Sequence, residues 1–326
     1  MVTFRKLGVW TIGAVYLLIL VGGIVRATGS GMGCPDWPKC FGTWIPPTDI
    51  SQLPINYKEI FGAKLKGQVE FNAVKTWVEY INRLVGVLIG IFVFATFVSS
   101  IKSFWNKDRA IVWLSFSAFI LVAFEGWLGS KVVSSELHPV MITLHMLLSV
   151  IIVFILLYAV ARSYNSVLIV ESVKEANSLS FLLTALILVT LGQVLLGTQV
   201  REMMDEISMS MGEGLRDSWV ASLGSKFEIH RWFSVIVLGL HILFIYRIIK
   251  NNPNKGIIYQ FSVGLMVLIA VEIGSGIILA YLGFPAFSQP IHLTIAILIL
   301  GVQFILYLLL NKERVFRGVL DFSLNK

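Results

Sequence analysis

The chain has 326 residues, a length that in a soluble protein would suggest two or three domains. Its composition excludes that interpretation, because 56% of the residues are hydrophobic, only 14% are charged and the mean hydropathy is +0.82. A soluble surface needs roughly 25% charged residues. The net charge of +7 does not indicate nucleic-acid binding, since the basic residues are scattered between apolar runs. We therefore interpret the chain as an integral membrane protein surrounded by lipid.

Eight stretches are long and apolar enough to cross a bilayer, which takes about 20 mostly apolar residues in a helix. None of them shows the short alternating pattern of a membrane barrel strand. The first follows Arg5 and Lys6, as a signal peptide would, but it is too long for one and its cleavage signal is weak, so we expect it to be retained. The predicted spans are 8–25, 76–99, 110–133, 139–161, 179–200, 227–249, 257–282 and 290–310.

The charges between the spans predict the orientation of the chain. The side with both termini and the even-to-odd loops holds 14 basic and five acidic residues, a net charge of +9. The opposite side and the outer halves of the helices hold the other 12 basic and 14 acidic residues, a net charge of −2. Basic loops remain in the cytoplasm. Both termini are therefore expected there, and the long loops 27–75 and 201–226 are expected outside.

The two halves of the chain repeat the same landmarks. Asn82 in the second span precedes His145 by 63 residues, and His230 in the sixth span precedes His292 by 62. Further pairs stand at matching distances from these histidines or close the same spans: Glu125 with Glu272, Gly129 with Gly276, and Val25-Arg26 with Val200-Arg201. Matches at this many landmarks indicate a duplicated unit.

Four helices return a chain to the side on which it started, so both halves have the same topology. We expect an all-α membrane protein made of two four-helix bundles, related by a pseudo-twofold axis along the membrane normal. The N-terminal half is predicted to cover 1–165 and the C-terminal half 175–326, each with a site between its facing helices.

Three histidines mark these sites. His145, His230 and His292 lie in the outer parts of even-numbered spans and therefore at similar depth. Ionisable residues inside a membrane are costly and usually face a cavity, a partner or a cofactor. Two imidazoles that face each other can hold haem iron from opposite sides, and we expect this of His230 with His292. The alternatives are simple hydrogen bonds to neighbouring helices, or zinc, which needs a third protein ligand.

A further histidine, His241, faces the same way as His230 about three turns deeper. It has no counterpart in the first half, so we expect a hydrogen-bonded interior side chain rather than a second site on the cytoplasmic side. Glu79 lies one turn before Asn82 and is expected to point into the first-half site. For the deeper Glu125 and Glu272, structural and proton-handling roles both remain open.

Four arginines lie at the outer interface, where guanidinium groups can pair with haem propionates. Snorkelling of their side chains to the membrane surface is the alternative. Two of them directly follow the candidate ligand positions, and two close spans one and five: Arg83, Arg231, Arg26 and Arg201.

Two cysteines, Cys34 and Cys40, lie in the first external loop with two prolines between them. Disulfides persist on that side of the membrane, and the prolines preorganise a small loop, so we expect a disulfide. A redox-active thiol pair is the alternative.

The segment 26–42 reads RATGSGMGCPDWPKCFG and resembles the first external loop of the haem A synthase family. The stretch from Glu79 to Arg83, the helical histidines and the eight-span duplication also match, so the resemblance covers nearly the whole chain. It implies oxidation of a methyl group of haem O to a formyl group, which gives haem A for cytochrome oxidase. It also implies substrate haem at His145 in the N-terminal half and a haem b at His230 and His292 in the C-terminal half.

The resemblance further implies a multi-pass protein of the bacterial inner membrane. Its expected partners are membrane lipid, a haem O synthase (farnesyltransferase) and the assembly of cytochrome oxidase, with no nucleic acid and with a homo-oligomer left open. The chain departs from the family pattern at Asn82, where a ligand histidine is common. Catalysis with Glu79, His145 and Asn82 at an open iron face is one interpretation. A non-catalytic di-haem cytochrome is another, and a secondary transporter is a third.

Overall fold

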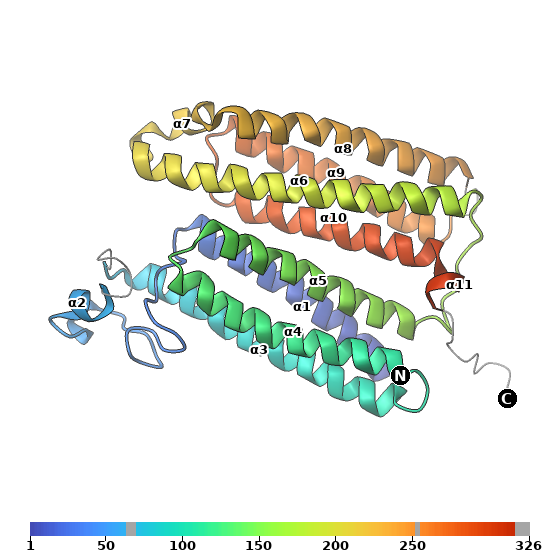
Figure 1. The fold of residues 1–326 in the computed structure, drawn as a ribbon, viewed down its shortest axis with the longest axis horizontal. Coiled ribbons are helices and arrows are strands. Elements are labelled where there is room, and N and C mark those ends of the chain that lie inside the picture. The colour runs from blue at the N-terminus through green and yellow to red at the C-terminus, as the bar shows by residue number, and fades with distance from the viewer. Residues whose placement is uncertain (63–69, 252–254, 317–326) are drawn as a thin grey trace.

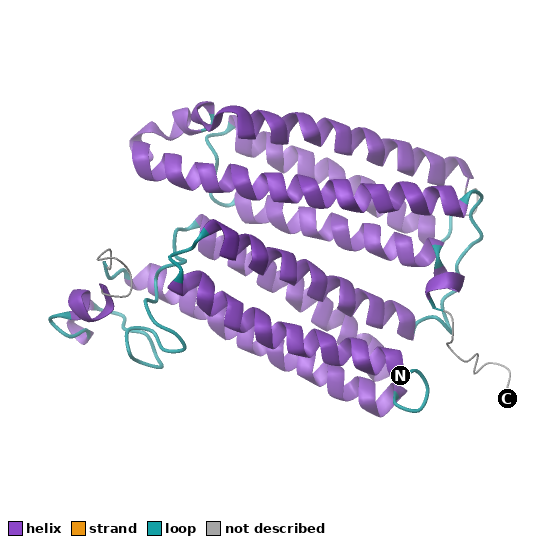
Figure 2. Ribbon diagram, viewed as in Figure 1, coloured by secondary structure: helices purple, strands orange, loops and turns teal. Residues whose placement is uncertain are grey.

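The computed structural model describes residues 1–62, 70–251 and 255–316 (Figure 1). Five residues that entered the charge count lie outside these ranges: Lys64, Lys66, Arg317, Asp321 and Lys326. Within them the regular secondary structure is helical (Figure 2), apart from an isolated bridge between Cys40 and Thr43. The long helices are α1 (Val2–Ala27), α3 (Ala73–Phe104), α4 (Arg109–Ser134), α5 (Pro139–Ser163), α6 (Ala176–Met211), α8 (Gly224–Asn251), α9 (Ile257–Tyr281) and α10 (Ser288–Leu310).

Each of these eight is long and apolar enough to cross a membrane, which confirms the predicted all-helical, multi-pass architecture. The short helices are α2 (Tyr57–Gly62), α7 (Arg216–Trp219) and α11 (Lys312–Val315). In Figure 1, α2 and α7 lie at one end of the long helices, whereas the N-terminus and α11 lie at the other end. This arrangement agrees with the predicted placement of both long loops on one side.

Local signals explain where several helices begin and end. The side chain of Asn72 accepts a hydrogen bond from the Lys75 amide (3.1 Å) at the start of α3, and Pro139 occupies the first turn of α5. Helix α6 ends at Met211 and is followed by Gly212, whose φ of 70° suits glycine.

The predicted second external loop is wrong over residues 201–211, because these residues continue α6 beyond its apolar part. Arg201 and Asp205, four residues apart on the helix, form an ion pair of 2.7 Å. No glycine or proline interrupts the chain between this pair and Gly212.

By their packing, the long helices form two groups of four, which lie one above the other in Figure 1. In the first, α1 and α4 each pack against both α3 and α5, so α3 and α5 lie on a diagonal. In the second, α6 and α9 each pack against both α8 and α10, so α8 and α10 lie on a diagonal. Neighbouring helices thus follow the same pattern in both halves, while the axis that would relate the halves remains a prediction.

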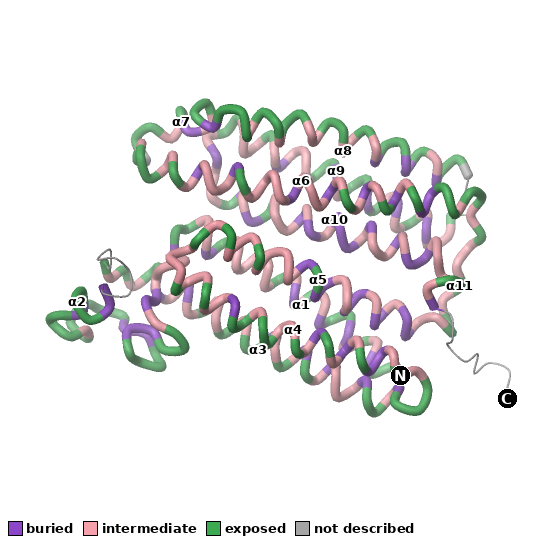
Figure 3. Tube along the Cα trace, viewed as in Figure 1, coloured by how far each residue is buried: buried purple, intermediate pink, exposed green. Residues whose placement is uncertain are grey.

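Helix α10 is the centre of the molecule, because it also packs against α1 and α5 of the first half. Half of its apolar window is buried, compared with a third or less in every other span. Close packing explains small residues at this junction: a Cβ on Gly23 would lie 2.9 Å from Pro290 Cβ. The outward faces are exposed (Figure 3) and carry large apolar side chains such as Trp10 and Phe181. In water such a surface would be unfavourable, whereas in a membrane it meets lipid.

Candidate functional site

His230 on α8 and His292 on α10 face each other across the diagonal of the second bundle. Their ring centres are 6.5 Å apart and their planes are inclined by 73°. One metal ion held by two imidazole nitrogens at bonds of about 2 Å, with each nitrogen about 1.2 Å from its ring centre, requires a separation of about 6.4 Å. The two rings therefore lie at the spacing that one shared iron requires.

Helix α9 holds the His292 ring in a defined orientation. Ser275 Oγ lies 2.8 Å and Glu272 Oε1 3.1 Å from His292 Nδ1. A neutral imidazole has a single N–H, and two facing oxygens favour its placement at Nδ1, which leaves the lone pair of Nε2 for a metal. Gly276 completes this support, since a Cβ there would lie 3.3 Å from His292 Cε1.

Helix α6 supports His230 in a related way. The Gln193 amide donates to the His230 backbone carbonyl (3.0 Å) and lies 3.5 Å from His230 Nε2, the outer limit for a hydrogen bond. His230 Nδ1 is buried and has no hydrogen-bond partner among the described residues. A Cβ on Gly197 would lie 3.3 Å from the ring. An imidazole with an unpartnered nitrogen, facing a second imidazole, fits a haem ligand pair.

The first bundle repeats half of this arrangement. His145 on α5 has Glu125 Oε1 of α4 at 3.2 Å from its Nδ1. A Cβ on Gly129 would lie 3.4 Å from the His145 ring, just as a Cβ on Gly276 would lie 3.3 Å from the His292 ring. At the position matching His230 stands Asn82, whose Oδ1 is buried without a hydrogen-bond partner in the described part of the chain. The first bundle therefore offers one imidazole where the second offers two.

The contact of each glutamate with its histidine was not predicted from the sequence. Glu125 and Glu272 each precede the histidine by 20 residues, and this repeated spacing was the available signal. The structure turns it into a repeated side-chain contact between adjacent helices. Carboxylates that contact a ligand histidine orient its ring.

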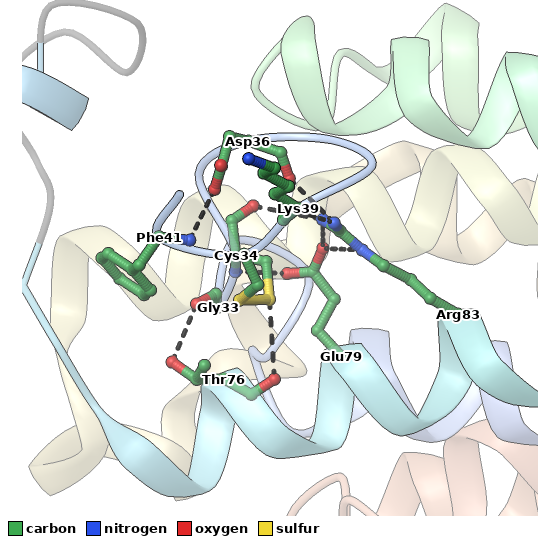
Figure 4. Close-up of polar contacts among 9 residues, drawn as sticks. Gly33, Cys34, Asp36, Lys39, Phe41, Thr76, Glu79 and Arg83 are labelled. Carbon is green, nitrogen blue, oxygen red and sulfur yellow. Dashed lines mark hydrogen bonds and ion pairs between the residues drawn. A yellow bond between two sulfur atoms is a disulfide. The ribbon is translucent and has the colours of Figure 1, made fainter. Parts of the chain in front are cut away.

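The external loop is closed by the predicted disulfide between Cys34 and Cys40, whose Cα atoms are 4.9 Å apart. Both cysteines are fully buried. The loop lies on the outer end of α3 (Figure 4), where Thr76 Oγ1 donates to the Gly33 carbonyl (2.8 Å).

Glu79 points into this loop and not, as we had expected from its position one turn before Asn82, into the first-half site. Its Oε2 accepts the backbone N–H of Cys34 (2.8 Å), and its Oε1 pairs with Arg83 (Figure 4). Arg83 also donates to the backbone carbonyls of Asp36 (2.8 Å) and Lys39 (3.0 Å). One carboxylate and one guanidinium thus connect α3 to the disulfide loop.

All four arginines proposed for propionates have a carboxylate partner within the protein. In addition to the pair of Arg83 with Glu79, the exposed Arg231 pairs with Glu228 (2.5 Å). Arg26 of α1 and Arg201 of α6 share Asp205, at 3.0 and 2.7 Å. Asp205 thereby links the two halves at their outer ends. The role of these arginines toward haem remains a prediction.

His241 is the hydrogen-bonded interior histidine that we expected. Its Nδ1 lies 2.7 Å from the Val237 carbonyl, and its Nε2 lies 2.7 Å from Nε2 of Gln303, which also donates to Thr190 (2.9 Å). In the described ranges, no group of three His, Cys, Asp or Glu side chains is placed to hold a metal ion. The candidate sites are therefore built on single or paired histidines.

These features define a polytopic helical membrane protein with paired intramembrane histidines. The chain belongs to the COX15-CtaA family, described as cytochrome oxidase assembly proteins, whose family model matches residues 5–304. It is similar to a heme A synthase of Rickettsia africae, with 24% identity over 90% of this chain and 94% of the relative. It is also similar to a heme A synthase of Shewanella oneidensis, with 30% identity over 56% of this chain and about half (52%) of the relative. The family comprises oxidoreductases of haem, so a haem cofactor or substrate is implied.

Proposed function

We propose that this chain is a haem A synthase, which oxidises one methyl group of haem O to a formyl group. The proposal assigns haem O to the N-terminal half at His145 and a haem b to the C-terminal half between His230 and His292. The observation that carries it is the spacing of 6.5 Å between the facing rings of His230 and His292, in a member of a family whose similar proteins are named heme A synthase.

The conversion replaces two hydrogens of the methyl group by one oxygen, a four-electron oxidation that requires an external oxidant; with dioxygen, the methyl group and O2 give the formyl group and one water. Haem supplies the redox chemistry when it is bound, and the protein supplies binding, orientation and electrostatics. His145 would hold the substrate at this end of the site, and Glu125, whose Oε1 lies 3.2 Å from His145 Nδ1, is the carboxylate placed to orient the ring.

Glu79 is the proposed catalytic carboxylate. It stands one turn before Asn82 on α3, at the boundary between the bundle and the disulfide loop, and its side chain is only 4% exposed. The amide of Cys34 and the guanidinium of Arg83 hold its two oxygens. In this place it can hold or pass a proton between the site and the outer surface, provided that the loop keeps it in position.

Expression in cells that supply haem O but lack their own haem A synthase tests the proposal. We expect extracted pigments to include haem A, identified by the mass of two hydrogens lost and one oxygen gained. A His145→Ala variant should make none while keeping the haem of the C-terminal half. Accumulation of haem O without haem A in cells with folded wild-type protein would contradict the proposal.

A non-catalytic di-haem cytochrome is the second candidate, and one observation favours it. Asn82 stands where a second imidazole would complete the first-half site, so this site differs from the C-terminal one. If this candidate is correct, the purified protein carries two haems and exchanges electrons, but the haem O supplied to it stays unmodified. The same pigment extraction therefore separates the two candidates. A transporter is disfavoured, because the eight spans are continuous helices over their described residues.

A further inference from the structure

A second polar layer lies beneath the two facing histidines. His241 follows His230 on α8 by eleven residues, and Gln303 follows His292 on α10 by the same number. Eleven residues make about three helical turns, so each side chain returns to the face of the histidine above it, about 16 Å deeper. The helix faces that bring the two imidazoles together across the diagonal therefore also bring His241 and Gln303 together.

Hydrogen bonds join this deeper layer across three helices. A carbonyl can only accept, so His241 Nδ1 donates to Val237 (2.7 Å), and His241 Nε2 accepts the Gln303 amide (2.7 Å). The Gln303 amide also donates to Thr190 Oγ1 of α6 (2.9 Å). All three side chains are buried, at 5% exposure or less. We call Thr190, His241 and Gln303 the polar brace.

The first half has apolar side chains at the matching positions. Each member of the polar brace stands eleven residues from a landmark that repeats in the two halves. The repeated landmarks are Arg26 with Arg201, Asn82 with His230, and His145 with His292. The residues that match the brace are buried at 6%, 0% and 1% exposure and belong to one hydrophobic cluster: Val15, Val93 and Leu156. The bundle can therefore hold an apolar layer at this level, and the half with two facing imidazoles has a polar layer instead.

The polar layer is less favourable than an apolar one unless it has a further role. Buried polar groups need partners, and Gln303 Oε1 is buried without one among the described residues. Hydrogen bonds are directional, however, whereas apolar contacts are not and permit small shifts of one helix against another. Two imidazoles whose centres are 6.5 Å apart hold each other only through a shared ion. Their spacing before iron binds consequently depends on the helices.

We propose that the polar brace holds α8 and α10 at the separation and angle that His230 and His292 need in order to share one iron. Its members are positioning residues, because they lie about three turns below the imidazoles and act through the helices. The inference rests on the proposed function, since it requires the haem between these two histidines. A site preorganised in this way binds more tightly, because less ordering is left to occur on binding.

Exchange of the brace for the first-half residues tests this role. The triple variant is Thr190→Val, His241→Val and Gln303→Leu, made in a His145→Ala background so that one haem site remains. Apolar replacement of buried polar groups is often neutral or stabilising, so the midpoint of thermal unfolding without haem should stay or rise. The affinity for added haem b should nevertheless fall about tenfold, as when groups that orient a metal ligand are lost.

Electron paramagnetic resonance of the loaded protein gives a second readout. The g values of low-spin iron with two imidazole ligands depend on the angle between the ring planes. In the triple variant these g values should spread over a wider range than in the His145→Ala background, because the two helices are no longer held at one angle. Loss of stability alone does not change this angle in the folded protein, so the g values decide the matter if midpoint and affinity both fall.

Two further variants complete the experiment. Asn311→Ala is the matched control, because the Asn311 amide also joins the end of α10 to α6, through Ser180 Oγ (2.9 Å), but far from His292. It should keep the affinity and the g values. Thr190→Val alone keeps the shape of the side chain and should broaden the same signal by less than the triple variant.

The contrary results are distinct. Unchanged affinity and g values in the triple variant would overturn the polar brace, whatever the thermal midpoint does. Equal effects of the triple variant and Asn311→Ala would overturn it too. If the triple variant does not fold, unchanged g values in Thr190→Val have the same meaning. If the His145→Ala background itself shows no low-spin signal from two imidazoles, the proposed haem site fails, and not the brace alone.

Discussion

Removal of the Arg83 guanidinium should release the disulfide loop from α3. Arg83 pairs with Glu79 and donates to the carbonyls of Asp36 and Lys39, so one side chain joins three parts of this region. In an Arg83→Ala variant the Glu79 carboxylate keeps the Cys34 N–H as a donor but loses the positive charge of Arg83 beside it. We expect the loop to open far more often as a result.

The size of the effect follows from burial. The side chain of Arg83 is 14% exposed and that of Glu79 is 4% exposed, so water screens the pair weakly. Breaking a buried ion pair by removing one partner costs about 3–5 kcal/mol. Since each 1.4 kcal/mol corresponds to a factor of ten, the open population of the loop should rise between about 10²- and 10⁴-fold. Arg83→Lys should fall between wild type and Arg83→Ala, because an ammonium can pair with Glu79 but lacks the fork of donors.

Reduction of the disulfide measures this opening. Cys34 and Cys40 are fully buried, so a reductant such as a phosphine must wait until the loop opens. When reclosing is fast, the rate of such a reaction follows the open population. Mass-tagged maleimide labelling of the freed thiols reports that rate. Arg231→Ala is the matched control, because its pair with Glu228 is about half exposed and such pairs are worth about 0.2–1 kcal/mol. If Arg83→Ala is reduced no faster than Arg231→Ala, Arg83 does not fasten the loop.

Three further changes have defined outcomes. Gly276→Val should displace the His292 ring and lower the affinity of the C-terminal half for haem by about tenfold or more. Gly264→Val on the same helix is the control, because a Cβ there meets nothing within 4 Å, and this variant should keep its haem. Equal haem content in the two variants would contradict the packing argument. Asp205→Ala removes the carboxylate that Arg26 and Arg201 share and should lower the free energy of unfolding by about 1–3 kcal/mol. The measurement is the midpoint of thermal unfolding in detergent, which should fall. An unchanged midpoint would show that this link between the halves does not stabilise the protein. Glu79→Ala should keep the C-terminal haem but stop the formation of haem A, and undiminished haem A in extracted pigments would remove this residue from the proposed chemistry.

The spans were predictable because lipid requires about 20 apolar residues in each helix. All eight predicted spans have a helix at their position. The ends were less predictable, because hydropathy reports the apolar part of a helix and not its length. Helix α6 continues to Met211 through an ion pair between Arg201 and Asp205, which an apolar window does not detect.

The facing histidines could be derived from the repeat, since helical spacing and equal depth bring His230 and His292 to the same level. The directions of long charged side chains could not. Glu79 lies on the predicted helix, but the fold of the disulfide loop supplies the Cys34 amide that it binds. Arg26 likewise reaches an aspartate 179 residues away in sequence, a partner that only the packing of α1 beside the second half provides.

The shared iron of His230 and His292 is the claim on which this account depends. Haem content and low-temperature electron paramagnetic resonance of the purified protein test it most directly, on wild type and on His230→Ala and His292→Ala. In wild type we expect a low-spin signal typical of iron with two imidazole ligands. In either variant this signal should disappear, and the haem content should fall by one haem per chain. Full haem content with an unchanged low-spin signal in either variant would show that this pair of imidazoles does not hold the iron.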